Sequence, residues 1–287
     1  MLSYENFIKN YEMVRLFAFG LGDGWLQQVG KNRFQLFYSG KISTLEVIQK
    51  DFQKYGINSG IDYRRNTLAV YSRSLARKFY ELGFPIGKKT DQEFLVPSWV
   101  FKSNIEVKRA FLQGLFGADG SVPEVRRYTA YNINYTIVKK PGLERNAKQF
   151  LSQIAQLLGE FGISTGRISS FKQKNKNVGF RLIIYSEENI IRFLKEVGYA
   201  YDVEKIEYAE RAMRYLLHKH SILNKKREAI EAINSLRKQG LGAKRIYKEL
   251  STRYNISLRF IERTIYEGRT EIRIWRTDMP PFERYYF

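Results

Sequence analysis

The sequence predicts an α+β fold made of two similar halves followed by a small helical domain. Three observations predict it: a motif ending in Asp-Gly occurs twice, the segments after the two motifs resemble each other, and the last part of the chain carries only helical patterns. The periodicity within each half gives the order αββαββα. We expect the first half over residues 1–102, the second over 103–220 and the helical domain over 221–287.

The repeated motif opens each half. It reads RLFAFGLGDGWL from Arg15 to Leu26 and AFLQGLFGADGSV from Ala110 to Val122, so that Asp23 and Asp119 each precede a glycine. A glycine inside a helix costs about 1 kcal/mol relative to alanine, and these helices contain several. Close contact between two helix backbones explains this composition, because a missing side chain lets a partner come nearer. The glycines concerned are Gly20, Gly22, Gly114 and Gly117.

The segments after the motifs repeat as well. The stretch 54–84 reappears as 160–199, with Gly56 aligned on Gly162 and Gly83 on Gly198. Helical patterns run up to Gly56 and Gly162, which we expect to end those helices. The clearest strand is TAYNINYTIVKK, which alternates between apolar and polar residues. Its apolar face carries Tyr131, Ile133, Tyr135 and Ile137, and its polar face carries Asn132, Asn134 and Thr136.

Composition narrows the function classes. The chain holds 49 Lys and Arg against 29 Asp and Glu, a net charge of +20, which favours a polyanionic partner and above all nucleic acid. It has no Cys, and its two His, His218 and His220, are too few for a histidine-based metal cage. No apolar run reaches the roughly 20 residues of a membrane span, and the N-terminus does not read as a signal peptide. We expect an intracellular protein, in the cytoplasm or an organelle, without a membrane partner.

The two motif aspartates predict a metal site. If the motif helices lie side by side across a pseudo-twofold axis, Asp23 and Asp119 meet at one end of their interface. Two close carboxylates repel each other unless a cation lies between them. Mg²⁺ (or Mn²⁺) suits a site with few carboxylates and leaves room for water and phosphate. We expect the metal to be held by Asp23 and Asp119, with help from the adjacent Gly22 and Ala118.

The motifs resemble a known family. LFAFGLGDG (Leu16 to Gly24) and LQGLFGADG (Leu112 to Gly120) are similar to the paired signature of LAGLIDADG homing endonucleases of the two-motif, monomeric type. Neither copy matches the signature throughout, since Leu21 and Gly117 stand where the family name has its first Asp. The resemblance covers residues from about 10 to 200. It implies two sheets that form a saddle on the DNA major groove, with the motif helices between the halves.

The resemblance also implies an activity and its residues. The activity is hydrolysis of both strands of a long double-stranded DNA site by a divalent metal that activates water and stabilises the leaving 3′ oxygen. Family members often place a basic residue near the end of the second strand of each half, and Lys41, Lys139 and Lys140 match that location. The polar strand faces would contact DNA. The residues expected there are Gln35, Arg64, Arg65, Asn132, Asn134, Thr136 and Arg181.

The C-terminal segment reads as a separate module. Three helical patterns are broken at QGLG and YNIS, and the last helix begins with Ser257 as its N-cap. This order indicates a helix-turn-helix, although an ordinary three-helix bundle has the same pattern. Arg259 and Arg263, four residues apart on one helix face, would contact DNA. The module would then extend the DNA footprint.

Three other readings compete with a free-standing or intron-encoded endonuclease. Inteins carry the same fold, but the chain begins with Met1 and ends in ERYYF, which does not fit a splicing element. A non-catalytic transcription regulator would join this fold to a helix-turn-helix, but such regulators have typically lost the acidic pair. An RNA maturase uses the same fold to assist intron splicing, and composition does not separate RNA from DNA.

Overall fold

The computed structural model describes residues 4–31, 33–173, 176–268 and 272–285. The chain forms two compact units. The first comprises Met1–Glu124 and Ala130–Met213, and the second comprises Val125–Thr129 and Arg214–Phe287. None of the described helices combines the length and apolar character that crossing a membrane requires.

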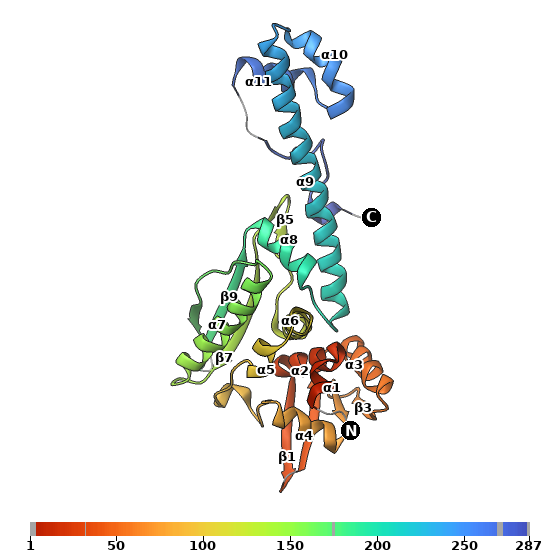
Figure 1. Cartoon of the computed structure of the whole chain (residues 1–287), viewed down its shortest axis with the longest axis vertical. Helices are drawn as coiled ribbons and strands as arrows, with labels where there is room; N and C mark the ends of the chain where they lie inside the picture. Colours follow the sequence, from red (N-terminus) through yellow and green to blue (C-terminus); the bar gives the residue numbers. More distant parts are fainter. Residues whose placement is uncertain (1–3, 32, 174–175, 269–271, 286–287) are drawn as a thin grey trace. The chain divides into compact units, whose positions relative to one another are not determined.

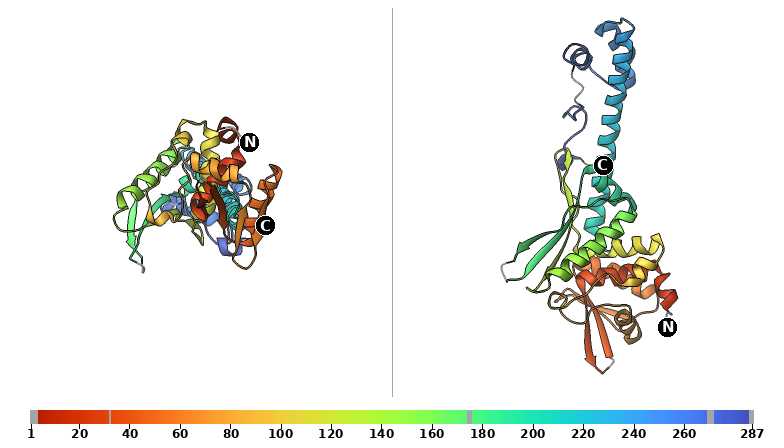
Figure 2. Two further views of the ribbon diagram at one scale, coloured as in Figure 1. Left: turned by 90° about the horizontal axis from the view of Figure 1, so that it is seen from below. Right: turned by 60° about the vertical axis from the view of Figure 1, so that its left-hand side comes forward.

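The first half of the first unit has the predicted order. After a short α1 (Tyr4–Ile8) come α2 (Tyr11–Asp23), β1 (Gly24–Gly30), β2 (Arg33–Ser39), α3 (Ile42–Lys54), β3 (Ser59–Asp62), β4 (Thr67–Val70) and α4 (Arg73–Glu81). The strands form one antiparallel sheet in the order β1-β2-β4-β3. The β1–β2 hairpin extends away from the helices of this half (Figure 2). Asn10 begins α2 as N-cap, because its side chain accepts hydrogen bonds from the backbone N–H groups of Glu12 and Met13.

The second half follows a linker with η1 (Lys89–Asp91) and α5 (Ser98–Lys102). It contains α6 (Ile105–Asp119), β7 (Asn132–Lys139), α7 (Glu144–Glu160), β8 (Ser169–Lys172), β9 (Val178–Tyr185) and α8 (Glu187–Glu196). Between α6 and β7 the chain also forms β5 (Val125–Arg126), which belongs to the second unit, and β6 (Thr129–Ala130). The sheet order is β7-β9-β8, and α7 packs on β7 and β9 (Figure 1).

The second half departs from the predicted pattern at its first strand. Gly120 pairs with Tyr135 only as an isolated bridge, and further bonds to β7 come from the N–H groups of Ser121 and Glu124. Pro123 lies between these two residues and has no N–H to donate, which explains why no continuous strand forms there. The two halves are therefore alike in element order but unequal in sheet size.

The motif helices α2 and α6 pack against each other, and two of the four glycines allow it. A Cβ atom on Gly22 would lie 2.4 Å from the Cβ of Ala118, and one on Gly114 would lie 2.3 Å from the carbonyl oxygen of Arg15. The prediction of backbone contact is confirmed there. Gly20 and Gly117 serve other contacts. The flanking residues Leu16, Phe19, Leu112, Leu115 and Phe116 are buried.

Gly20 and Gly117 admit the segments that end each half. A Cβ on Gly20 would lie 3.0 Å from the ring of Phe84, and one on Gly117 would lie 2.0 Å from the backbone oxygen of Ala200. Phe84 follows α4 and Ala200 follows α8, so the two contacts are equivalent in the two halves. These glycines let the chain after each half pass close to the motif helix.

The second unit contains a helical module. Most of α9 (Val203–Lys238) belongs to it, with α10 (Ala243–Tyr254), α11 (Leu258–Tyr266) and η2 (Phe282–Arg284). The expected domain boundary at residue 220 falls inside α9, because the helical pattern continues across it. Ser257 is the N-cap of α11, as predicted, since its Oγ accepts a hydrogen bond from the N–H of Phe260 at 3.2 Å.

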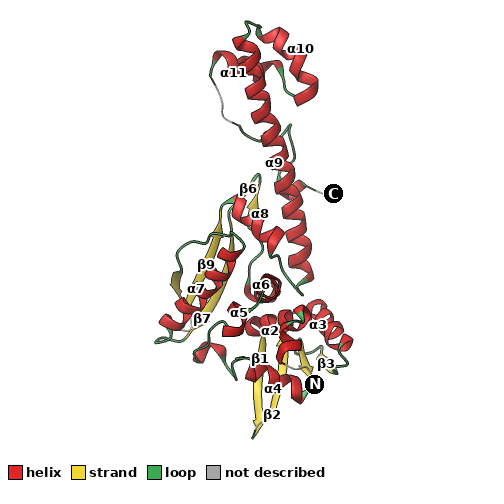
Figure 3. Cartoon of the chain, in the orientation of Figure 1, coloured by secondary structure: helices red, strands yellow, loops and turns green. Residues whose placement is uncertain are grey.

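The core of this module joins α9, α10 and α11. Its fully or nearly buried members include Ile233, Ile246, Leu250, Ile256 and Ile261. The turn between α10 and α11 spans three residues, and its first, Asn255, has a φ of +50°, a conformation that Asn tolerates better than most residues. Residues 272–285 run back along α9, mostly as loop (Figure 3). A three-residue turn thus joins α10 to α11, and the assignment of this module as a helix-turn-helix stays a prediction.

Candidate functional site

Asp23 and Asp119 lie at the C-terminal ends of the packed motif helices. The helices run parallel, because Gly22 lies near Ala118 while Gly114 lies near Ala18. A Cβ atom on Gly22 would stand 2.8 Å from Oδ2 of Asp119, so the missing side chain leaves the space that this carboxylate uses. Asp23 is half-buried and Asp119 is reached by solvent. The two carboxylates thus meet at one end of the interface, as the sequence predicts.

The surroundings disfavour negative charge on both carboxyl groups. Although solvent reaches Asp119, protein atoms crowd its carboxyl group, and this loss of hydration raises its pKa to about 6. The negative charge of Asp23 raises the pKa of Asp119 further, while the ammonium of Lys89 lowers it. Burial also raises the pKa of Asp23, against the lowering effects of Lys205 and Lys89. The site therefore holds a carboxylate pair whose charge is only partly balanced.

Lys89, in the linker after the first half, supplies one balancing charge. Its Nζ donates hydrogen bonds to the carbonyl oxygens of Leu21, at 2.6 Å, and of Gly20 and Gly22. These carbonyls are in the last turn of α2, where the helix has run out of further N–H groups, and only the carbonyl of Gly20 also accepts a backbone bond, from the N–H of Gly24. Desolvation lowers the pKa of Lys89 to about 8, against the opposing effects of Asp119 and Asp23. The ammonium caps α2 and faces both carboxylates.

Lys205 caps the motif helix of the second half, α6, in the same way. Its Nζ donates to the carbonyl oxygens of Gly117, at 2.8 Å, and Ala118, at 2.6 Å. Desolvation lowers its pKa, and the charges of Asp202, Asp23 and Asp119 oppose that effect. A positive charge at a helix C-terminus also interacts favourably with the helix dipole. Each motif helix therefore ends in one aspartate and is capped by one lysine.

The sequence reasoning missed this lysine pair, although the repeat contains the signal. Lys89 lies six residues after Gly83, and Lys205 lies seven residues after Gly198, its aligned partner. Extending the alignment by one turn would have identified both. The alignment does not give the direction of the two side chains, because that direction depends on how each segment passes beside Gly20 or Gly117.

Tyr135 donates a hydrogen bond to Asp119, and the equivalent tyrosine of the first half does not do so for Asp23. The register places Tyr135 opposite Gly120 and Tyr38 opposite Gly24, so the two tyrosines occupy equivalent positions. Tyr135 is buried, and its hydroxyl lowers the pKa of Asp119 by hydrogen bonding. The Tyr38 hydroxyl donates instead to the carbonyl oxygen of Leu16 at 3.0 Å. The pseudo-twofold symmetry is thus broken beside the carboxylates.

The three lysines expected near the strand ends lie in different settings. Lys41 is exposed and pairs with Glu204. Lys140 is exposed and forms an ion pair of 2.6 Å with Asp91. Lys139 is 1% exposed, and its Nζ donates to the carbonyl oxygens of Lys89, at 2.7 Å, and Gln92. Lys139 therefore holds the linker that carries Lys89, and in this position it is not free to contact a substrate.

The donor set fits a metal only through the two carboxylates. The carbonyl oxygens of Gly22 and Ala118, expected to assist a metal, accept hydrogen bonds from Lys89 and Lys205 instead. Within residues 4–31, 33–173, 176–268 and 272–285, no group of three or more His, Cys, Asp and Glu could hold an ion. Two carboxylates beside the space left by Gly22 still suit Mg²⁺, which commonly keeps several water ligands and uses substrate phosphates.

The residues expected to contact DNA fall into two surfaces of the first unit. On β2, Gln35 lies opposite Gln27, and the neighbouring pair Trp25 and Phe37 stacks with ring centroids 4.8 Å apart. In the β3–β4 turn, the exposed Arg64 and Arg65 donate their backbone N–H groups to the Asp62 carboxylate. The half-buried aromatic pair was not predicted.

The second surface lies on β7 and β9. Asn134 Nδ2 donates to Asn132 Oδ1 at 2.7 Å, and Thr136 pairs with Arg181 across the two strands. The Arg181 guanidinium lies over the ring of Phe171, 5.0 Å from its centroid. All four predicted residues lie on the half-buried face, and their alternation with buried neighbours is confirmed. In the second unit, Arg259 and Arg263 both line a pocket beside α11.

Both halves match family models. Residues 16–77 match the WhiA LAGLIDADG-like domain, and residues 106–198 match the LAGLIDADG-like domain. The first unit therefore consists of two LAGLIDADG-like domains and has the LAGLIDADG-like α+β fold that the sequence predicts.

Several curated proteins match this chain over a minor part of their own length. The tRNA-splicing ligase RtcB of Pyrococcus furiosus is 36% identical over 91% of this chain and 28% of its own length. The replication factor C small subunit of Methanocaldococcus jannaschii is 31% identical over 86% of this chain and 14% of its own length. The RNA polymerase subunit Rpo1N of the same organism is 25% identical over 74% of this chain and 17% of its own length. The chain spans less than a third of each relative.

Two solved structures are similar at low identity. The full-length DUF199/WhiA protein from Thermatoga maritima matches with a TM-score of 0.41 and 17% identity, over 91% of this chain and 93% of its own. The LAGLIDADG meganuclease I-AabMI, bound to uncleaved DNA, matches with a TM-score of 0.43 and 12% identity, over 74% of this chain and 92% of its own.

Proposed function

We propose that this chain is a sequence-specific DNA endonuclease that cuts both strands of a long duplex site at the paired Asp23 and Asp119, with Mg²⁺ or Mn²⁺. The observation that carries the proposal is the arrangement of two carboxylates and two lysines at the ends of the parallel motif helices. A protein that only bound DNA would have no need for a carboxylate pair where the substrate phosphates must approach, because the pair repels them.

The residues of the site have separate tasks. Asp23 and Asp119 would hold the divalent ion, which when bound supplies Lewis acidity to the scissile phosphate and lowers the pKa of water. Lys89 and Lys205 hold the last turns of α2 and α6 in place and reduce the electrostatic cost of bringing a phosphodiester to two carboxylates. Tyr135 orients the Asp119 carboxylate by a hydrogen bond.

The names of the relatives support a transferable module. A tRNA-splicing ligase, a replication factor subunit and an RNA polymerase subunit differ in what their names describe, yet each matches most of this chain over a small part of its own length. A segment that recurs in such different proteins does not owe its function to any one of them, so we do not assign RNA ligation to it. The pattern favours a segment carried within other proteins over the free-standing or intron-encoded origin expected from the sequence.

The partner would be double-stranded DNA bound by a monomer. The net charge of +20 supplies the phosphate contacts. The strand faces with Gln35, Asn134 and Arg181, together with Arg64 in the β3–β4 turn, supply polar groups for base edges.

The test is selection of cleaved sites from a randomised duplex library with Mg²⁺ or Mn²⁺. The wild type should release one recurrent sequence, while Asp23→Asn and Asp119→Asn should bind that sequence and cut it at least about 100-fold more slowly, the loss typical of removing a central charge-stabilising group. Glu81→Gln, which removes one exposed carboxylate on α4, is the matched control and should cut normally. Cleavage by either Asn variant at the wild-type rate would refute the proposal.

A second candidate is a DNA-binding regulator without catalysis. Its support is the match of residues 16–77 to the WhiA LAGLIDADG-like domain, together with a C-terminal module in which a short turn joins α10 and α11. In that case the library would yield one retained sequence and no cut product with any divalent metal. Retention of intron RNA in preference to duplex DNA would point to the maturase alternative.

A further inference from the structure

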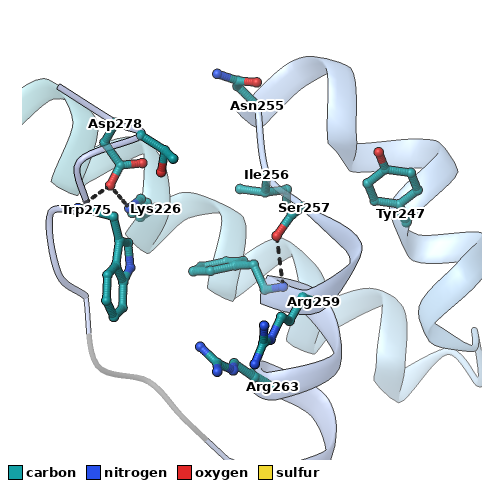
Figure 4. Close-up of a pocket in the computed structure, with 11 residues that line it drawn as sticks. Lys226, Tyr247, Asn255, Ile256, Ser257, Arg259, Arg263, Trp275 and Asp278 are labelled. Carbon is teal, nitrogen blue, oxygen red and sulfur yellow. Dashed lines mark hydrogen bonds and ion pairs between the residues drawn. The ribbon is translucent and has the colours of Figure 1, made fainter.

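The second unit contains a pocket that the proposed cleavage does not use. It lies between α11 and the returning segment 275–278 and has a volume of about 460 Å³ (Figure 4). This volume is within the roughly 300–1,000 Å³ range of sites that hold small molecules. Three aromatic side chains line it from different segments: Tyr247 from α10, Phe260 from α11 and Trp275 from the returning segment.

The charges around the pocket are arranged for an anion. Lys226 and Asp278 also line it, but they form a 2.5 Å ion pair and neutralise each other. Arg259 and Arg263 lie one helical turn apart on α11 (Figure 4) and line the same pocket as Phe260 and Trp275. In the described part of the chain neither guanidinium forms an ion pair, so both positive charges remain for a ligand.

The aromatic wall on the returning segment is held in place. Asp278 Oδ2 accepts a hydrogen bond from the N–H of Trp275 at 2.7 Å, in addition to the ion pair with Lys226. Lys226 Nζ also donates to the carbonyl oxygen of Arg273 at 2.9 Å. Lys226 and Asp278 are largely buried, whereas Trp275 is 55% exposed. The backbone of Trp275 is thus fixed by buried groups, while its indole is open to a flat partner.

We propose that this pocket binds one unpaired nucleotide of a single-stranded nucleic acid. The base lies against Trp275 and Phe260, and the adjoining phosphate lies on Arg259 and Arg263. Aromatic faces stack on any unpaired base, and basic groups follow the backbone, which is the usual combination in single-strand binding. A base inside a duplex is stacked on its neighbours and cannot offer its face, so the site discriminates single strands from duplexes.

The test measures binding by Trp275 fluorescence without metal, so cleavage does not contribute. A Trp25→Phe background removes the other accessible indole, because Trp99 is 6% exposed. The probes are a 12-nucleotide thymidine strand, the matching uridine strand and a 12-base-pair duplex. Both single strands should quench Trp275, and the duplex should quench it much less.

Substitutions in the pocket should weaken only single-strand binding. Phe260→Leu and Arg263→Ala should each lower affinity for the single strands roughly 5- to 100-fold, the range for losing one stacked base or one charge-assisted contact. The controls Tyr266→Leu and Arg245→Ala change an exposed aromatic and an exposed charge outside the pocket and should bind as before.

Two results would overturn the proposal. One is unchanged single-strand affinity in Phe260→Leu and Arg263→Ala. The other is an equal loss of duplex and single-strand affinity, which would make the pocket a contact to the duplex backbone. The measurement is made whether or not the protein cleaves, so its failure leaves the proposed endonuclease activity untouched.

Discussion

Gly22 of one motif helix lies directly against Asp119 of the other, and a single Cβ atom would occupy the space between them. This contact joins the fold to the site. The same missing side chain that lets α2 and α6 pack closely also gives the Asp119 carboxylate its place. Substitutions here should therefore affect stability and activity together, whereas changes elsewhere should separate them.

Gly22→Ala should destabilise the first unit by about 1–3 kcal/mol, because the added methyl group would lie 2.4 Å from the Cβ of Ala118 and the helices would have to separate. The free energy of unfolding from urea titration is the measurement. Gly159→Ala is the control: Gly159 is in α7 with no atom within 4 Å of an added Cβ, so alanine should stabilise the protein by about 0.5–1 kcal/mol. Equal effects of the two substitutions would contradict the packing argument.

Asp119 should make stability depend on pH below neutrality. Its folded-state pKa of about 6 is above the usual 3.8, so its protonated form is favoured in the folded protein. Its contribution to stability is complete below pH 3.8 and is lost as the pH rises through about 6. The Asp119→Asn variant keeps a neutral side chain at every pH, so its stability does not fall in this way as the pH rises.

The measurement is the melting temperature of both proteins from pH 4 to pH 8 in EDTA. At pH 8 Asp119→Asn should be more stable than the wild type by about 1 kcal/mol, a discounted figure because solvent reaches the carboxylate. The difference should shrink as the pH falls to 4. A difference independent of pH would show that Asp119 ionises normally.

Lys139→Met should destabilise the protein by about 1–3 kcal/mol. The buried ammonium satisfies the carbonyl oxygens of Lys89 and Gln92, and methionine would leave them without a donor. Lys140→Met is the adjacent control. It removes only an exposed ion pair with Asp91 and should cost at most about 1 kcal/mol.

Cleavage assays on the same two variants separate a structural role from a catalytic one. If Lys139 acts by holding the linker, cleavage by Lys139→Met should recover at low temperature, where the linker refolds. A stable Lys139→Met protein that lacks all cleavage would instead return this lysine to the catalytic role that the family resemblance suggests.

Lys226→Met should loosen the second unit. Asp278 is largely buried, and removing its partner would leave an uncompensated carboxylate, at a cost of about 3 kcal/mol. Amide hydrogen exchange should rise in the segment 272–279 and in the adjoining turn of α9. Lys225→Met, at the exposed neighbouring position, should leave exchange unchanged. Protection that survives Lys226→Met would mean that the segment is held by other contacts.

The sequence alone determined the repeat and most of the elements. Alternation predicted β7, the glycines at 56 and 162 end their helices with positive φ angles, and Ser257 caps α11. These features depend on residues close together in the chain, so local periodicity and turn chemistry reveal them. The pairing of Asp23 with Asp119 was also predictable, because a repeated motif implies repeated geometry.

Only the tertiary structure decided which lysines serve the site. Lys139 looked like the basic group at a strand end, yet its side chain is buried against the linker, while Lys89 and Lys205 reach the helix ends from segments far away in sequence. Strand alternation says which face a side chain takes, but not what covers that face. The cover comes from long-range packing at Gly20 and Gly117, where the chain after each half passes close to a motif helix. The repeat alignment can pair Lys89 with Lys205, but whether their side chains reach the helix ends depends on the shape of the whole unit.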